Sequence, residues 1–257
     1  MFLGIDIGSS SSKAVILDEN LTMLGKAVIN TGTGTLGPEK AIEIALSKAG
    51  LSREAIKYAI VTGYGRITYA KADKQITEIS CHAKGVAFME PNARTVIDIG
   101  GQDVKVIRLD DGGRVENFVM NDKCAAGTGR FLEVMARILD CDIEMLASLD
   151  AESTKEIIIS NTCTVFAESE VISQLSSGAK RENVAKGAHH AVAKRVAGLA
   201  HRIGIRPEVV MTGGVALNKG VVSALSQEIG QTISVVKNPQ IVGALGAALF
   251  AAEMFKK

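Results

Sequence analysis

Two short segments of the sequence combine residue types that suit the binding of phosphate and magnesium. In the first, Asp6 ends an apolar run and is followed by Gly8, four serines and Lys13. A glycine turn lets backbone N–H groups approach an anion, serine hydroxyls add donors, and a lysine neutralises phosphate charge. In the second, Asp98 ends another apolar run and is followed by a glycine turn. Either aspartate could hold Mg²⁺, directly or through water, so both turns are candidate phosphate sites.

The two segments are copies of one another. Residues 5–18 read IDIGSSSSKAVILD and residues 97–110 read IDIGGQDVKVIRLD, so seven of fourteen positions match at an offset of 92. The matches include the whole IDIG core, and chance is a poor explanation for them. We therefore expect a gene duplication, with two halves that each open with the same strand–turn–strand unit.

A third glycine element lies at residues 209–218, VVMTGGVALN, where an apolar strand ends in Gly213 and Gly214 before a helix. Backbone there could contact an adenine or a ribose closely. Two more familiar phosphate motifs are disfavoured. The Gly25-Lys26 pair is followed by Ala, so it is no Walker A loop. The GxGxxG of residues 32–37 follows a third strand rather than the first strand of a βαβ unit, which disfavours a dinucleotide site.

The cysteines suggest a second kind of chemistry. They stand at positions 81, 124, 141 and 163, so no Cys-x-x-Cys of a zinc ribbon or ferredoxin loop exists. Cys124 and Cys163 each precede an expected helix, where free N–H groups and the helix dipole favour a thiolate or an anionic cluster. A [4Fe–4S] cluster needs four thiolates, so two per chain imply a cluster shared across a two-fold dimer. The alternative is that all four are small buried hydrophobes.

Two similar α/β halves are expected to position these residues, each with three antiparallel strands and then helices that alternate with parallel strands. In the first half we expect strands at about 2–7, 12–18, 22–30 and 57–62, and helices at about 38–49 and 71–88. In the second half we expect strands at about 94–99, 104–109, 114–120, 156–160, 209–212 and 232–236, and helices at about 129–140, 183–203 and 241–255.

The composition narrows the classes of partner. The chain of 257 residues has 29 basic and 28 acidic residues and a formal net charge of +1. This balance gives no sign of a nucleic-acid partner or an anionic membrane. The first residues lack a basic region and a long apolar region, and the last apolar run is too short for a bilayer. We expect a cytoplasmic protein without a membrane segment.

The set IDIGS, IDIGGQD and MTGG resembles the phosphate and adenosine signatures of the acetate kinase/sugar kinase/Hsp70/actin superfamily. Within it, NDKCAAGTGRF and CTVFAESEVIS resemble the activators (component A) of 2-hydroxyacyl-CoA dehydratases, which are BadF/BadG/BcrA/BcrD-type ATPases. The resemblance covers essentially the whole chain. It implies an α/β fold of two duplicated actin/Hsp70-like (RNase H-like) halves, residues 1–93 and 94–257, with a nucleotide cleft between them. A last helix at about 241–257 would pack back on the first half.

The resemblance also implies cofactors and residue roles. ATP or ADP with Mg²⁺ would lie in the cleft, and Cys124 and Cys163 from each subunit of a homodimer would bind one [4Fe–4S] cluster. Asp6 would act with Mg²⁺, directly or through water, and Gln102 or Asp103 would orient the attacking water. The implied nucleotide contacts are Gly8, Ser9, Ser10, Ser11, Ser12, Lys13, Asp98, Gly100, Gly101, Gly213, Gly214, Gln240 and Gly243.

The function that the resemblance implies is ATP-driven electron transfer. One electron, supplied by ferredoxin or flavodoxin, would pass through an oxygen-sensitive cluster to a separate 2-hydroxyacyl-CoA dehydratase. Similar activators serve benzoyl-CoA reductase-type enzymes or other iron–sulfur proteins, and nothing in the chain names the partner. Two other functions stay open: a metabolite kinase on the same fold, and a non-redox ATP-binding protein whose cysteines belong to the core.

Overall fold

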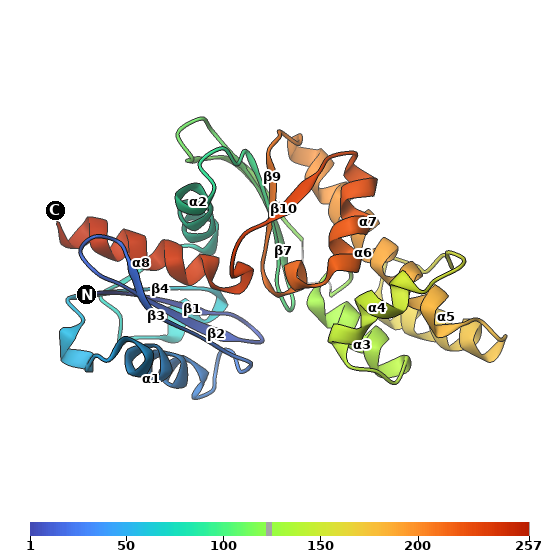
Figure 1. Ribbon diagram of the computed structural model, residues 1–257, viewed down its shortest axis with the longest axis horizontal. Helices are drawn as coiled ribbons and strands as arrows, with labels where there is room; N and C mark the ends of the chain where they lie inside the picture. Colours follow the sequence, from blue (N-terminus) through green and yellow to red (C-terminus); the bar gives the residue numbers. More distant parts are fainter. Residues whose placement is uncertain (122–124, 257) are drawn as a thin grey trace.

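The computed structural model describes residues 1–121 and 125–256 and contains two five-stranded β-sheets (Figure 1). The strands of the first sheet are β1 (Phe2–Ile7), β2 (Ser12–Leu17), β3 (Met23–Ile29), β4 (Tyr58–Thr62) and β5 (Lys74–Gln75). The strands of the second sheet are β6 (Thr95–Ile99), β7 (Val104–Leu109), β8 (Val115–Met120), β9 (Val209–Thr212) and β10 (Ile233–Val235). The strand orders are β3-β2-β1-β4-β5 and β8-β7-β6-β9-β10.

The two sheets repeat one topology, as the sequence repeat predicted. In each sheet the first three strands are antiparallel neighbours, and the fourth and fifth strands add in parallel beside the first. The register places Asp6 opposite Lys13 and Asp98 opposite Lys105. The expectation of two duplicated α/β halves is therefore confirmed.

Helices cover both faces of each sheet. They are α1 (Gly37–Ala49), α2 (Glu78–Met89), α3 (Gly129–Ile138), α4 (Leu146–Ala151), α5 (Thr164–Ser176), α6 (Arg181–Ile203), α7 (Lys219–Ile229) and α8 (Val242–Phe255). Helix α1 shares a core with the first sheet, and α3, α6 and α7 share a larger core with the second. Among the described residues, no helix has the length and apolar character needed to cross a bilayer.

Two predicted elements differ from the structure. Residues 156–160 form no strand, because this apolar run packs on helix α6 instead: Ile159 is buried and the Ile157 carbonyl lies against Gly187. The helix expected at 71–88 begins only at Glu78, where the Thr77 side chain caps it, because residues 74–75 pair with β4 as an edge strand. Helix α4 was not predicted, since its six residues are too few for a periodic pattern.

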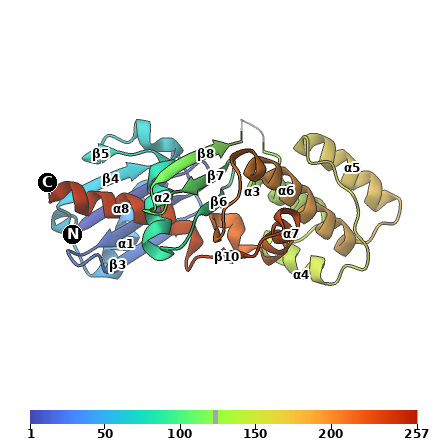
Figure 2. The ribbon, with the colours of Figure 1, turned by 90° about the horizontal axis from the view of Figure 1, so that it is seen from above.

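Two helices are exchanged between the halves. Helix α2 follows the last strand of the first sheet, yet Ala83 and Val86 belong to one core cluster with Val96 of the second sheet. Helix α8 follows the last strand of the second sheet, yet Leu245 shares a cluster with Val15 of the first. Helix α8 runs along the strands of the first sheet, and α2 lies beside it in both ribbon views (Figures 1 and 2).

The exchanged helices touch backbone to backbone. A side chain at Gly246 in α8 would overlap the carbonyl oxygen of Cys81 in α2. A side chain at Gly4 in β1 would likewise overlap the carbonyl oxygen of Ala244. Glycine costs a helix interior roughly 1 kcal/mol relative to alanine, so Gly246 is explained by this close approach. The crossing of α2 and α8 therefore sets how the two halves face each other.

We predict that Gly246→Ala lowers the free energy of unfolding by about 2 kcal/mol or more, because the added methyl group forces α2 and α8 apart. The matched control is Gly198→Ala in α6, where an added methyl group meets no atom within 4 Å. That control should stabilise the protein by roughly 0.5–1 kcal/mol. Urea denaturation followed by circular dichroism measures both, and equal stability of the two variants would contradict the close crossing.

Candidate functional site

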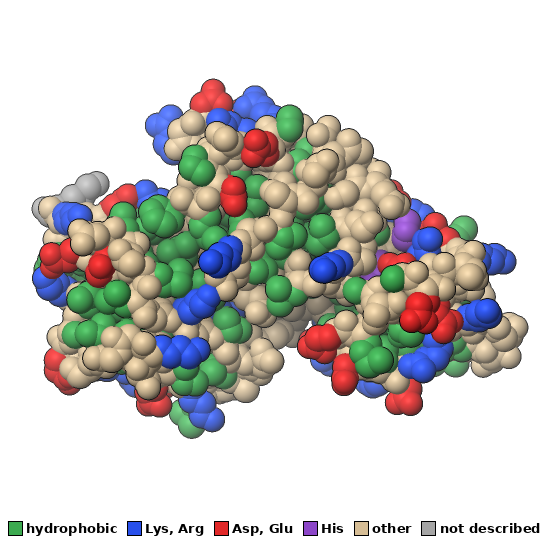
Figure 3. All heavy atoms as spheres, in the orientation of Figure 1, with side chains coloured by type: hydrophobic (Ala, Val, Ile, Leu, Met, Phe, Trp, Pro, Cys, Tyr) green, Lys and Arg blue, Asp and Glu red, His purple; other side chains and the backbone are tan. Residues whose placement is uncertain are grey.

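A large cleft lies between the two sheets, with a volume of about 1230 Å³. The space-filling view shows the molecule hollowed between its two halves (Figure 3). The cleft brings together most of the residues predicted from sequence. These are Asp6, Gly8, Ser9, Ser10, Ser11, Lys13, Asp98, Gly100, Gly101, Gln102, Asp103, Gly213, Gly214 and Gln240.

Two predicted contacts lie outside the lining of the cleft. The Ser12 side chain is fully buried, and its hydroxyl donates to the backbone carbonyl of Thr31 at 2.7 Å. Gly243 lies behind the Asp6 carboxylate: a side chain there would come within 3.1 Å of Asp6 Oδ2. Both residues are therefore placed to support the lining from behind.

The two glycine turns have the same internal geometry. We call residues 8–11 the first glycine loop and residues 100–103 the second. Gly8 N donates to the carbonyl of Ser11 at 2.9 Å, and Gly100 N donates to the carbonyl of Asp103 at the same distance. The loops approach each other across the cleft, because a side chain at Gly101 would overlap the Ser10 hydroxyl. A phosphate chain between them could contact both halves.

Each glycine loop is flanked by the same charge pair, with an aspartate before the loop and a lysine after it. Lys13 Nζ lies 3.2 Å from Asp6 Oδ2, and Lys105 Nζ lies 3.3 Å from Asp98 Oδ2. The sequence motifs indicate Lys13 but not Lys105. The repeat carried the necessary signal, since the two lysines match at its offset of 92.

The second pair belongs to a denser buried network. Lys105 Nζ also lies 2.5 Å from Asp103 Oδ2 and 3.0 Å from Glu78 Oε2. Burial lowers the pKa of Lys105, but the three carboxylates raise it by more, so the net shift is upward and the group stays charged. Burial raises the pKa of Asp98, but His82, Lys105 and the Thr212 hydroxyl lower it to about 2.

The third glycine element also has a counterpart. Gly213 has a φ of 86° and Gly63 a φ of 91°, and a side chain at either would overlap the carbonyl oxygen at the end of the neighbouring strand, that of Ile99 or Ile7. Both follow a threonine at the end of a parallel strand. The sequence repeat of residues 5–18 and 97–110 does not include this match between TGYG and TGGV. The repeat thus includes the parallel strands β4 and β9.

The GxGxxG of residues 32–37 supports the first glycine loop. Thr33 N donates to the Gly8 carbonyl at 2.9 Å, and a side chain at Gly32 would overlap the Ser9 carbonyl. Because Gly32 and Thr33 are both in contact with the loop, the start of the motif supports the loop from behind.

Asn218, which is not among the contacts predicted from the sequence, lines the cleft and is held from behind. Its Oδ1 accepts from Val221 N and caps helix α7, and its Nδ2 lies 3.1 Å from His189 Nε2. His189 is fully buried, with Nδ1 2.7 Å from Asp150 Oδ2. An imidazole that donates to Asp150 and accepts from Asn218 satisfies all three groups. His189 is therefore structural, and it positions a residue of the cleft.

Helix α3 is attached to the second glycine loop. Gly129 N donates to the Gly100 carbonyl at 2.9 Å, and Arg130 N donates to the Gly101 carbonyl at 2.8 Å. The first amides of a helix lack partners within it, and here the loop supplies them. A displacement of the loop would therefore move the start of α3.

Of the two predicted cluster cysteines, the structure describes only Cys163. Cys124 lies outside the described residues. Cys163 is a partly buried free thiol at the N-cap of α5, whose first amides receive no side-chain cap. Burial raises the pKa of the Cys81 thiol to about 12, and burial also raises the pKa of Cys141. Within residues 1–121 and 125–256, no group of three or more His, Cys, Asp or Glu could hold a metal ion.

Two duplicated halves around a cleft with paired glycine loops define the class of the protein: it has the ATPase fold of actin, Hsp70 and sugar kinases. More narrowly, the chain belongs to the BadF/BadG/BcrA/BcrD ATPase family, whose model matches residues 3–251.

Relatives of known name agree with this assignment. The activator of lactoyl-CoA dehydratase of Anaerotignum propionicum is 57% identical, over 99% of this chain and 98% of its own. The solved activator of the 2-hydroxyisocaproyl-CoA dehydratase from Clostridium difficile, with bound ADPNP, has a TM-score of 0.96 at 55% identity, over 100% of this chain and 96% of its own. A benzoyl-CoA reductase polypeptide of Thauera aromatica is 34% identical, over 99% of this chain and 94% of its own.

We predict that Lys105→Met lowers the free energy of unfolding by about 3–5 kcal/mol, because it leaves three carboxylates around an uncharged side chain. Lys13→Met is the matched control, since Lys13 is more exposed than Lys105 and pairs with Asp6. Its loss of stability should be smaller. Urea titration at neutral pH measures the free energy of unfolding of both variants. An equal loss in the two variants would contradict the larger contribution of Lys105 to stability.

Proposed function

We propose that this chain is an ATP-dependent activator that passes single electrons from a [4Fe–4S] cluster to a 2-hydroxyacyl-CoA dehydratase-type partner. The observation that supports it best is the attachment of α3 to the second glycine loop through Gly129 and Arg130. Cys124 stands shortly before this helix in the sequence. A nucleotide held by the loop and a cluster held by Cys124 would therefore act on the same short piece of backbone.

The cleft suits ATP with Mg²⁺. The phosphates would lie between the two glycine loops, and the adenosine near Gly213, Gly214 and Gln240. Asp6 faces the cleft from the end of β1 and would hold Mg²⁺ directly or through water. Asp103 already pairs with Lys105, whereas Gln102 is exposed at the cleft. We therefore prefer Gln102 to Asp103 as the residue that orients the attacking water.

The surroundings of Cys163 fit a cluster ligand. Free amides at the start of a helix favour a thiolate and an anionic cluster, and α5 offers them beside Cys163. Cys81, by contrast, is fully buried with a raised pKa, which disfavours a thiolate there. When bound, the cluster would supply one-electron transfer, and Cys124 with Cys163 from each of two chains would hold it.

A homodimer would account for exposed apolar side chains that lie close to Cys163 in the sequence. Val165 and Phe166, which follow it in α5, are 67% and 69% exposed, and Ile158 is 78% exposed. Large apolar side chains exposed together usually mark an interaction site. A second copy of the chain that brings its own Cys163 to the same place would cover them.

The proposed coupling uses relative motion of the two halves, residues 1–93 and 94–257, except that helix α8 would move with the first sheet and helix α2 with the second. A terminal phosphate held by both glycine loops would draw the halves together, and its loss on hydrolysis would release them. The second glycine loop would transmit this motion to α3. Hydrolysis itself would need mainly positioning and charge neutralisation.

The proposed electron acceptor is chosen from the named relatives, and the proposed electron donor from the chemistry of one-electron transfer. Relatives above 50% identity are named as activators of 2-hydroxyacyl-CoA dehydratases, so a dehydratase of that class is the proposed electron acceptor. A benzoyl-CoA reductase-type acceptor is the second candidate, because of the relative at 34% identity. Ferredoxin or flavodoxin in the cytoplasm would supply the electron.

We predict that Gly214→Leu weakens ATP binding by at least about tenfold, or about 1.4 kcal/mol. Gly214 lines the cleft, and the nearest atom that a side chain there would meet is Gln240 Nε2, at 3.7 Å, so the leucine fills nucleotide space without disturbing the fold. Gly198→Leu, at an exposed position of α6, is the matched control and should bind ATP normally. Calorimetry measures the ATP affinity of both variants. Unchanged affinity in Gly214→Leu would contradict the placement of the nucleotide in this cleft.

We predict about four irons and four acid-labile sulfides per dimer of anaerobically purified protein. Cys163→Ser and Cys124→Ser should lose them, and Cys141→Ser should keep them, because Cys141 is the free cysteine not assigned to the cluster and not in the core. Iron assay, sulfide assay and dimer mass are measured together. Wild-type protein that stays colourless after anaerobic reconstitution would refute the proposed cluster. The alternative function, a metabolite kinase, would then be tested.

A further inference from the structure

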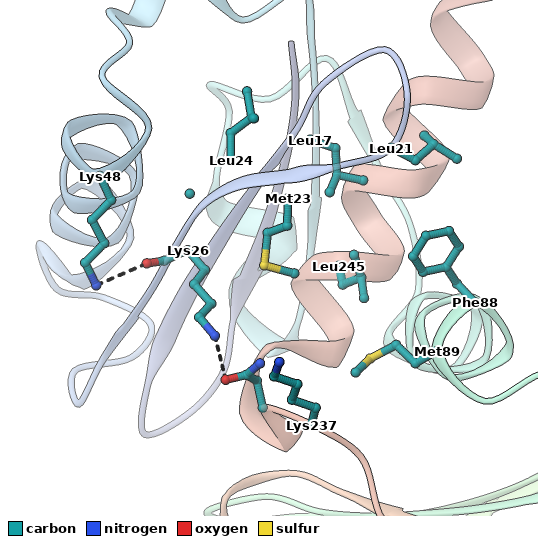
Figure 4. Close-up of a pocket in the computed structure, with 12 residues that line it drawn as sticks. Leu17, Leu21, Met23, Leu24, Lys26, Lys48, Phe88, Met89, Lys237 and Leu245 are labelled. Atoms are coloured by element: carbon teal, nitrogen blue, oxygen red, sulfur yellow. Dashed lines mark hydrogen bonds between the residues drawn. The ribbon is translucent and has the colours of Figure 1, made fainter.

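A second hollow lies outside the nucleotide cleft, between the β2–β3 hairpin, helix α8 and the end of α2 (Figure 4). Its volume is about 530 Å³, which falls within the roughly 300–1,000 Å³ of small-molecule sites. We call it the lysine groove. The apolar side chains that line it are Leu17, Leu21, Met23, Leu24, Phe88, Met89 and Leu245.

The charges around the lysine groove are of one sign. Among the described residues, Lys26, Lys48 and Lys237 line it and no carboxylate does. Lys26 Nζ donates to Asn238 Oδ1 at 2.5 Å and Lys48 Nζ donates to a backbone carbonyl at 3.4 Å, so neither ammonium group is neutralised there. An apolar floor with uncompensated ammonium groups at its edge complements a molecule that has an apolar chain and one negative charge.

The lysine groove also spans the two halves. The hairpin and α8 belong to the first sheet, whereas the end of α2 shares the core of the second sheet and Lys237 follows strand β10. The bond from Lys26 to Asn238 therefore crosses from one half to the other. Figure 4 shows the Lys26 side chain extending to a hydrogen bond beside Lys237.

A short backbone path joins the lysine groove to the nucleotide cleft. Asn238 lies in the groove, and the next residue, Pro239, accepts a hydrogen bond from Gly213 N at 3.0 Å. Gln240 then lines the cleft. A ligand that displaces Asn238 from Lys26 would release the start of a segment whose other end faces the nucleotide.

We propose that the lysine groove binds an amphiphilic carboxylate, with its chain on the apolar floor and its carboxylate between Lys26 and Lys237, and that this binding is coupled to nucleotide binding. The binding stands independently of the proposed function, whereas the coupling rests on it. By linkage, a carboxylate that shifts the Asn238–Gln240 segment changes the affinity for nucleotide, and nucleotide changes the affinity for the carboxylate by the same factor.

The test is calorimetric titration of the full chain, without nucleotide, with octanoate as the probe. We expect one saturable site per chain, with octanamide and acetate at least about tenfold weaker because each lacks one of the two recognised features. Lys237→Glu should weaken octanoate by at least about tenfold. Lys237 makes no hydrogen bond or ion pair within the described residues, so this variant should fold. Lys40→Glu is the matched control, because Lys40 is an exposed residue of α1 outside the groove; this variant should bind octanoate normally.

Equal binding of octanoate and octanamide, or unchanged binding in Lys237→Glu, would overturn the site. Absence of octanoate binding together with binding of an acidic apolar peptide would overturn it in favour of a protein-docking surface. The titration is then repeated with saturating ADPNP. If ADPNP binds and the octanoate affinity is unchanged, the coupling is refuted; if ADPNP does not bind, the proposed function fails while the octanoate site is judged on its own.

Discussion

The buried ammonium group of Lys105 ties together the parts that build the base of the cleft. Its three carboxylate partners come from helix α2 (Glu78), strand β6 (Asp98) and the second glycine loop (Asp103). A buried charge is tolerated only with its partners in place, so one atom fixes a helix, a strand and a loop at once. The matching lysine of the first half, Lys13, pairs with Asp6 and is more exposed. The duplicated halves have therefore diverged, with one anchored more firmly than the other.

The two glycine loops have equal internal geometry but different supports. The first glycine loop rests on residues 32–37, which lead into helix α1. The second rests on the start of α3, through Gly129 and Arg130. A force applied to both loops by one ligand would therefore reach two different helices. The two halves are therefore not equivalent. The second half, which contains Cys163, is the one whose glycine loop holds α3.

The sequence predicted the repeated part of the fold well, because hydrophobic runs and the IDIG repeat are local signals. Both Asp–Lys pairs could have been predicted, since the repeat places Lys105 opposite Asp98 just as Lys13 lies opposite Asp6. The resemblance implied that the last helix packs back on the first half, but the packing of α2 on the second sheet could not be predicted, because an apolar helix does not specify which sheet it covers. Glu78 was not predicted as a site residue for that reason: it belongs to α2, and its role depends on where that helix packs.

The exchange of the two helices has a consequence for how the chain folds. During synthesis the first sheet is complete once residue 75 has emerged, but the helix that covers one of its faces ends at Phe255. Until then Val15 and Leu17 have no cover on that face. Contacts between residues so distant in sequence slow folding, and uncovered apolar strands are prone to aggregate. The first half can therefore complete its core only after the last helix has been made.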